Sequence, residues 1–153
     1  MYCLDTSALF DGWVRYYPPA TFRTLWEDRL EGLIEGGRLI SSKSVLHEID
    51  DREDRCLEWA TNHADMFKED DEEIQARVRA LLADWPHEVD FTRFFTGADP
   101  FVVAHAQQNG FKVVTGERQV RSMNAPKIPD VCQHYGIPWC SLLGMIQEQG
   151  WQF

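Results

Sequence analysis

The chain has 153 residues, a length typical of one globular domain. Apolar residues make up 44% of it and charged residues 26%, which is the ordinary composition of a globular protein and argues against a disordered or fibrous chain. Fifteen Lys and Arg against twenty-five Asp and Glu leave a net charge of −10, so an evenly charged surface would repel nucleic acids and anionic membranes.

The first forty residues predict a strand, two helices and a second strand. Residues 1–5 are mostly apolar and lead into a capping sequence, which is typical of a buried strand that feeds a helix. This helix is expected over 7–17, because the two prolines that follow would end it. A second helix is expected over 21–36, with Thr21 as its cap and apolar residues at three- and four-residue steps. A short strand is expected over 39–40.

The middle of the chain is expected to be largely helical. Ser44 is a suitable cap for a helix that extends past Ile49. A further helix is expected over 57–67, and another over about 72–83, where apolar residues fall on one face.

The last third of the chain predicts two strands, each preceded by a helix. A helix is expected over 99–110, because the Asp at its start is a good N-cap, the next residue is Pro, and Gly ends it. The β-branched residues over 111–115 favour a strand. A helix over 128–136, a strand over 137–141 and a terminal helix over 142–149 are expected to follow.

Helices thus alternate with short apolar strands, and at least one helical stretch separates each pair of strands. This pattern predicts one α/β domain over residues 1–153, a three-layer α/β/α structure with a short-stranded parallel sheet. In such sheets the functional residues lie at the carboxyl ends of the strands.

The expected compartment is the cytoplasm. No apolar run is long enough for a transmembrane helix, and the first residues carry neither the basic nor the apolar region of a signal peptide. The cysteines form no C-x-x-C pair and, with the histidines, lack the spacing of zinc ligands; they are Cys3, Cys56, Cys132 and Cys140. We therefore expect free thiols, no membrane association and no zinc site.

Four carboxylates occupy positions that the predicted fold can bring together. Asp5 closes the first strand, Glu117 follows the strand over 111–115, and Asp99 begins the helix that precedes this strand. Glu48 lies on the helix that follows the second strand. Because the carboxyl ends of parallel strands meet at one edge of a sheet, we expect these four side chains to converge there.

Converging carboxylates repel one another, so such a cluster is stable at neutral pH only if it holds a cation. Oxygen ligands favour Mg²⁺ or Mn²⁺ over Zn²⁺. One or two such ions would lower the pKa of a bound water and stabilise the leaving oxygen of a phosphodiester. The hydroxyl groups of Thr6, Ser7 and Thr115 are expected to orient the carboxylates or a bound water.

Each acid, taken singly, has a simpler interpretation. Asp5 and Asp99 stand where a helix begins, and Asp at such a position is more often only a cap. Glu48 alone reads as a solvated helix residue and Glu117 as a loop acid. The functional interpretation therefore depends on the four acids together.

The same residues carry a resemblance to a known family. The relevant motifs are Tyr2–Leu9, Ser44–Ile49, Asp99–Ala106 and Gly110–Glu117. With these motifs the chain resembles a PIN domain, the nuclease fold of many bacterial toxins of the VapC type. More narrowly, it is similar to a bacterial family of uncharacterised PIN-like proteins, which pair a Trp-rich first half with a motif like Lys127–Cys132. The resemblance covers essentially the whole chain.

The resemblance implies a metal-dependent endoribonuclease, the toxin of a toxin–antitoxin pair. It assigns Asp5, Glu48 and Asp99 as ligands of Mg²⁺ or Mn²⁺, and Glu117 as the fourth acid of the metal site, where Asp is commoner in the family. It also implies an RNA substrate, a cognate antitoxin protein as partner, and a homodimer.

An RNA substrate would also need cations near the acids. Arg118, Arg121 and Lys127 follow Glu117 closely, and Arg15 follows the first motif. They are candidates for contacts to phosphates. The alternative is that they are simply solvated.

Two rival functions use the same features differently. In the first, the protein is a catalytically inactive PIN-like interaction module, and the acidic segment over 47–90 binds a basic protein partner. In the second, it is a phosphotransferase of the haloacid-dehalogenase type, which also begins with a strand and an Asp. That chemistry needs a second Asp two residues further on, where this chain has Ser7, so we give it little weight.

The negative charge is concentrated in one part of the chain. Residues 47–90 hold fifteen of the acids and five of the bases, whereas the rest of the chain is neutral. The acidic helical segment over about 50–90 is therefore either solvated or a docking surface for a basic partner. An RNA substrate is expected to bind elsewhere.

Overall fold

The computed structural model describes residues 1–50, 54–85, 95–121 and 124–153. Its five strands form one parallel sheet in the order β3-β2-β1-β4-β5. The strands are Tyr2–Leu4 (β1), Leu39–Ser42 (β2), Phe67–Lys68 (β3), Lys112–Val114 (β4) and Trp139–Cys140 (β5). The predicted α/β fold with a short-stranded parallel sheet is confirmed.

Strand β1 lies at the centre of the sheet, between β2 and β4. Cys3 pairs with Ile40 on one side and with Val113 on the other. All three residues of β1 are buried, and Cys3 has no exposed surface. Helices cover both faces of a parallel sheet, which explains why this strand is a continuous apolar run.

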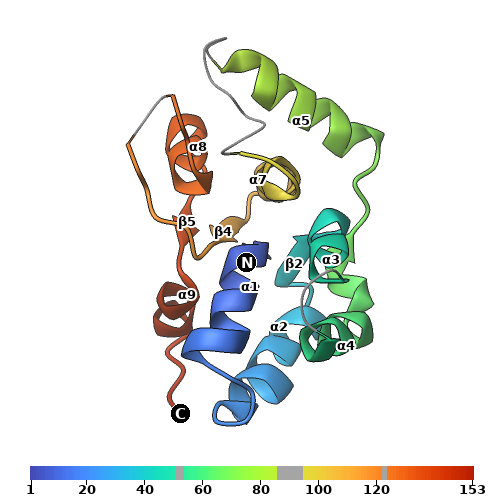
Figure 1. Ribbon diagram of the computed structural model, residues 1–153, viewed down its shortest axis with the longest axis vertical. Helices are drawn as coiled ribbons and strands as arrows, with labels where there is room; N and C mark the ends of the chain where they lie inside the picture. Colours follow the sequence, from blue (N-terminus) through green and yellow to red (C-terminus); the bar gives the residue numbers. More distant parts are fainter. Residues whose placement is uncertain (51–53, 86–94, 122–123) are drawn as a thin grey trace.

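Helices pack on the sheet in two groups. The first group is α1 (Thr6–Phe10), η1 (Asp11–Tyr16), η2 (Leu25–Leu30), α2 (Glu31–Glu35), α3 (Lys43–Asp50), α4 (Asp54–Asn62), the short η3 (Ala64–Met66) and α9 (Leu142–Glu148). The second group is α5 (Glu72–Asp84), α7 (Asp99–Asn109) and α8 (Ile128–Tyr135). Helix α7 packs against β1, β2, β4, α5 and α8. Figure 1 shows α5, α7 and α8 above the sheet and α1, α2, α4 and α9 below it, which makes three layers.

Several elements begin or end where the sequence indicated. Gly36 ends α2, and Gly110 and Gly136 end α7 and α8 in the left-handed conformation that a helix C-cap favours. Asp5 caps α1 by accepting a hydrogen bond from Ser7 N.

Four expectations about element ends were wrong. Phe67 begins the edge strand β3 rather than ending a helix, so the acidic segment contributes to the sheet. Ser42 Oγ, not Ser44, accepts a hydrogen bond from the start of α3, at 3.0 Å from Ser44 N. Ala98 is the N-cap of α7 and Asp99 its first residue. Helical backbone begins beyond Thr21, in the stretch that leads into η2.

The acidic segment is only partly helical in the described part of the chain. It contains α4, η3, β3 and α5. Of the predicted range, residues 51–53 and 86–90 lie outside the described residues. Among the described residues, no helix combines the length and the apolar character needed to cross a bilayer.

The order of the strands creates a switch point between β1 and β4. The chain runs from β1 through β2 to β3 on one side, and then crosses to β4 and β5 on the other. Parallel sheets bind ligands at the carboxyl ends of the strands on either side of such a point. Here Asp5 follows β1 and Thr115 follows β4.

Candidate functional site: an acidic centre at the switch point

Asp5 is the most buried member of the acidic centre, with 1% of its surface exposed. Its backbone N–H donates to Val114 O at 2.9 Å, which fixes the residue against β4. Its Oδ2 accepts hydrogen bonds from Ser7 N at 3.2 Å, from Ser7 Oγ, and from Thr115 Oγ1 at 3.1 Å. Its Oδ1 is buried and has no hydrogen-bond partner among the described residues. One oxygen of Asp5 is thus satisfied by the protein, and the other is not.

The hydroxyl groups predicted beside the acids link three segments. Ser7 Oγ lies 3.2 Å from Thr115 Oγ1 and accepts a hydrogen bond from Gly116 N at 2.9 Å. Thr115 Oγ1 accepts from Glu117 N at 3.1 Å. A Cβ at residue 116 would lie 2.5 Å from Asp11 Oδ2 and 3.2 Å from the backbone of Ser7, so Gly lets this turn pack closely on α1 and the start of η1. The network therefore holds the loop after β4 against Asp5.

Glu48 points toward the same edge from α3. It accepts a hydrogen bond from Thr6 Oγ1 through one oxygen and from Ala98 N, at 2.9 Å, through the other. Gly97 precedes Ala98 with a φ of +58°, and a Cβ on Gly97 would collide with Glu48 Oε1. Glu48 is therefore tied to Ala98, the N-cap of α7, and is not the freely solvated side chain that its position alone suggested.

Asp99 lies among the other three acids. Burial and, after it, the negative charges of Asp5, Glu117 and Glu48 together raise its pKa from 3.8 to about 8. A backbone hydrogen bond at Thr96 lowers the pKa only in part. The charges of the other three carboxylates all act on Asp99, as is expected if the four acids lie at one edge of the sheet.

Asp5 is affected in the same sense. Its pKa is raised from 3.8 to about 6, because burial and the charge of Glu117 outweigh the hydrogen bonds from Ser7 and Thr115. Without a cation, protons must neutralise part of this centre.

The charge of Glu117 acts on Asp5 and Asp99, but its carboxylate is held by the loop that follows it. Its Oε2 accepts from Ile128 N at 2.8 Å, and Lys127 Nζ lies 3.5 Å from its Oε1. The side chain of Glu117 thereby connects the end of β4 to the start of α8.

The chemistry of the centre fits a hard divalent cation, although its side chains are not arranged around one. Among the described residues, no group of three or more His, Cys, Asp or Glu side chains forms a ready metal site. Both glutamates are turned toward protein donors, as described above. The unpartnered Oδ1 of Asp5 and the destabilised charge of Asp99 are, by contrast, what a Mg²⁺ or Mn²⁺ ligand set offers before it binds its ion. Asp5 and Asp99 would bind the ion directly, and rotation of Glu48 and Glu117 would complete the set.

The four predicted RNA contacts lie in different environments. Arg118 is exposed beside Glu117, and Arg121 has a φ of +56° with its N–H donated to Asp130 Oδ1 at 2.8 Å. Lys127 pairs with Glu117. Arg15 forms an exposed ion pair with Asp11 at 2.9 Å, one helical turn away. Arg118 is thus the cation best placed to meet a ligand at the centre.

Asp130 is a residue that the sequence argument did not single out. It is 9% exposed and accepts hydrogen bonds from Val120 N at 3.2 Å, Arg121 N at 2.8 Å and Lys127 N at 2.9 Å. These bonds shape the loop that carries the predicted cations. The sequence does indicate this role, because Asp130 lies three residues after Lys127, the N-cap of α8, at the position where a capping box has an acid.

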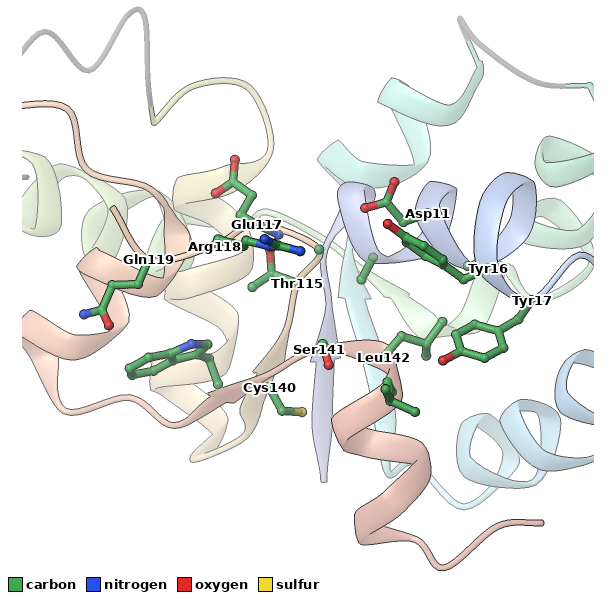
Figure 2. A pocket seen from close by; sticks show the side chains of 15 residues that line it. Asp11, Tyr16, Tyr17, Thr115, Glu117, Arg118, Gln119, Cys140, Ser141 and Leu142 are labelled. Atoms are coloured by element: carbon green, nitrogen blue, oxygen red, sulfur yellow. The ribbon is translucent and has the colours of Figure 1, made fainter. Parts of the chain in front are cut away.

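A cavity of about 580 Å³ lies beside the acidic centre (Figure 2). Thr115, Gly116 and Glu117 form one wall, and the segment with Asp11 and Tyr16 forms the opposite wall. Strand β5 and the start of α9 close the base. The cavity and the acidic centre therefore share the loop that follows β4.

Fold and site together define a parallel α/β protein with a carboxylate centre at its switch point. The chain belongs to the family described as "Domain of unknown function (DUF4411)", which it matches over residues 2–153. No curated protein matches the chain.

Proposed function

We propose that this protein is a metal-dependent endoribonuclease of the PIN type that hydrolyses RNA phosphodiesters. The observation that supports it most is the convergence of Asp5, Glu48, Asp99 and Glu117 at the carboxyl edge of the sheet, where the charge of Asp99 is strongly destabilised. These are the four acids that the resemblance to PIN domains assigns. A cluster of carboxylates next to an open cavity suits a cation and a phosphate ester better than a structural role.

Each residue of the centre has a definite task in this proposal. A bound Mg²⁺ or Mn²⁺ ion supplies activation of water and neutralisation of charge on the phosphodiester. Asp5 and Asp99 hold the ion, and Ser7 and Thr115 fix the Asp5 carboxylate by donating to its Oδ2. Glu48 and Glu117 complete the ligand set directly or through water.

The biological setting proposed is that of a cytoplasmic toxin restrained by an antitoxin. Residues 47–90 carry the excess negative charge of the chain, which suits a basic segment of such a partner. In the same setting the protein would form a homodimer, as the resemblance implies.

The test is cleavage of a mixed pool of single-stranded RNA in the presence of Mn²⁺. Wild-type protein is expected to cut the pool, EDTA is expected to stop the reaction, and Asp5→Asn is expected to be inactive while it keeps the wild-type circular dichroism spectrum. Asp65→Asn, which changes an exposed carboxylate outside the centre, is the matched control and is expected to cut normally. Full activity of Asp5→Asn, or full activity in EDTA, would contradict the proposal.

The interaction module remains the second candidate, and one observation favours it. Trp13, which is partly exposed, packs edge to face on the buried Trp26 beside a shallow cavity that Glu27 and Glu58 help to line, so an acidic surface with one accessible aromatic ring lies away from the acidic centre. Titration calorimetry with Mn²⁺ separates the two candidates, because a pure interaction module needs no cation at the acidic centre.

A further inference from the structure

The cavity beside the acidic centre has the size and position of a substrate pocket. Its volume of about 580 Å³ lies within the range of roughly 300–1,000 Å³ typical of small-ligand sites. Thr115, Gly116 and Glu117 line it and also belong to the loop that contacts Asp5 and Ser7. Of the four acids, Glu117 itself lines the cavity, so a molecule in the cavity would lie next to the acidic centre.

Aromatic side chains line this cavity on different sides. Tyr16 and Tyr17 come from the end of η1, and Trp139 comes from β5. Tyr16 is 62% exposed, a large value for an aromatic ring. Tyr17 is half-buried and packs edge to face on Phe22 at a centroid distance of 5.3 Å, so its ring is held in place. Rings of this kind stack on nucleobases irrespective of base identity.

A cation and hydrogen-bonding groups complete the lining. Figure 2 shows the Arg118 side chain pointing into the space between the loop after β4 and the segment with Asp11 and Tyr16. Among the described residues, Arg118 forms no ion pair, whereas Lys127 and Arg15 do. An unpaired guanidinium between an aromatic wall and an acidic centre is suited to a phosphate group.

We propose that this cavity binds one unstacked nucleotide of single-stranded RNA, next to the phosphate that is cleaved. The base stacks on the exposed ring of Tyr16, and Arg118 binds the phosphate that leads to the acidic centre. The inference rests on the proposed function, because it names how that site selects its substrate. A cavity of this volume has room for one nucleotide, and a base can enter it only when it is neither paired nor stacked.

The experiment measures RNA binding apart from cleavage. A fluorescein-labelled single-stranded octanucleotide RNA is titrated, in Mn²⁺, with full-length Asp99→Asn protein, and the dissociation constant is obtained from fluorescence anisotropy. Adding Tyr16→Ala to this protein is expected to weaken binding by roughly 5- to 100-fold, the loss expected for one stacked base. Adding Arg118→Ala is expected to weaken it by about tenfold and to reduce the salt dependence.

Two controls keep the result specific. Arg23→Ala removes an exposed arginine outside the cavity and Val14→Ala an exposed side chain of the same η1 segment; both are expected to leave the dissociation constant unchanged. Tyr16 and Arg118 are exposed, so their replacement preserves the fold, which the thermal midpoint checks. The duplex form of the same octanucleotide is expected to bind at least tenfold more weakly than the single strand.

The outcomes separate this inference from the proposed function. The nucleotide pocket is contradicted, and the nuclease activity is supported, if wild-type protein cuts RNA but Tyr16→Ala and Arg118→Ala bind RNA like their parent. The same holds if wild-type protein cuts RNA but the duplex binds as tightly as the single strand. If wild-type protein cuts no RNA but RNA binding depends on Tyr16 and Arg118, the nucleotide pocket is supported and the nuclease activity is contradicted.

Discussion

Asp70 and Asp99 are two acids withdrawn from water in one small fold, and their environments are opposite. Asp70 precedes α5 and accepts hydrogen bonds from Ser42 Oγ at 2.8 Å and from Ser44 Oγ at 2.6 Å, while His105 Nε2 lies 2.8 Å from its Oδ1. Burial favours the protonated form of Asp70, but His105, Ser44 and Ser42 outweigh it and lower the pKa overall. Around Asp99, three like charges add to the effect of burial and raise the pKa to about 8.

The difference shows how the fold treats a structural and a functional carboxylate. The hydrogen bonds to Asp70 fasten the start of α3 to α7 and to the segment before α5, so its charge is balanced within the protein. Asp99 lacks such a balance and needs a proton or a cation from outside. We therefore expect Asp70 to matter for stability, and Asp99 for binding and catalysis.

The largest expected effect is the loss of activity in Asp99→Asn. Removing one ligand of the cation should lower the rate of Mn²⁺-dependent RNA cleavage by about three orders of magnitude, which corresponds to about 4 kcal/mol of the activation barrier. The thermal midpoint of metal-free protein should stay the same or rise, because the substitution removes like-charge repulsion. A gel assay of cleavage and a thermal melt check both. A variant that melts well below wild type would mean that Asp99, like Asp70, is structural.

The second effect is on stability and concerns Asp70→Ala. The substitution leaves the buried hydroxyl of Ser42 and the ring of His105 without their acceptor, so the free energy of unfolding should fall by about 2–4 kcal/mol. Urea denaturation measures it. Asp71→Ala, which removes only the N-cap of α5, is the neighbouring comparison and should cost about 1 kcal/mol. An equal loss of unfolding free energy in the two variants would show that Asp70 contributes no more to stability than an N-cap does.

The third effect is a dependence of stability on pH. Since the pKa of Asp99 is raised from 3.8 to about 8, the folded protein holds a proton that the unfolded chain has released over this range. The free energy of unfolding of metal-free protein should therefore decrease as the pH rises from about 4 to about 8. Asp70 acts in the opposite sense, because its lowered pKa gives stability that is lost only as the pH falls below about 4.

Denaturation curves at several pH values measure this dependence. Asp99→Asn should flatten the decrease between about pH 6 and 8, whereas the part that Asp5 contributes between about pH 4 and 6 should remain. Mn²⁺ should flatten the whole decrease in the wild type by taking the place of the protons. A wild-type slope in Asp99→Asn would show that Asp99 is not the group responsible.

The smallest effect concerns the glycine beside Glu48. Gly97→Ala places a Cβ against Glu48 Oε1 in a left-handed backbone, whereas Gly37→Ala has the same kind of backbone, with a φ of +63°, and open space around it. Gly37→Ala should cost about 1–2 kcal/mol of stability from the backbone alone. Gly97→Ala should cost more and also reduce cleavage, because Glu48 is displaced. Denaturation and cleavage assays on both variants check this; equal results would mean that the position of Glu48 is unimportant.

The sequence predicted the elements that depend on local patterns and the residues that lie at the carboxyl edge of the sheet. The capping sequence at Asp5, the apolar residues of β4 and the glycines at 110 and 136 have local causes, and the structure has the corresponding elements. Because parallel strands bring their carboxyl ends to one edge of a sheet, the parallel arrangement also predicted that Asp5, Asp99 and Glu117 approach one another.

The features that the sequence did not predict depend on contacts between residues that lie far apart in the chain. Strand β3 has only two residues, too few to show a pattern within 57–67, and it forms only because it pairs with β2. Asp70 has no local signal, since its partners Ser42 and His105 come from β2 and α7. The orientation of Glu48 is likewise set by Thr6 and Ala98, which lie far away in the sequence.

Binding of Mn²⁺, measured by titration calorimetry on metal-free protein, tests most directly whether the acidic centre is a cation site. Wild-type protein and the control Asp65→Asn should bind Mn²⁺ with the same affinity, and Asp99→Asn should lose that binding while it remains folded. An absence of binding in the wild type, or equal binding in Asp99→Asn, would contradict the assignment of these four carboxylates as a metal centre.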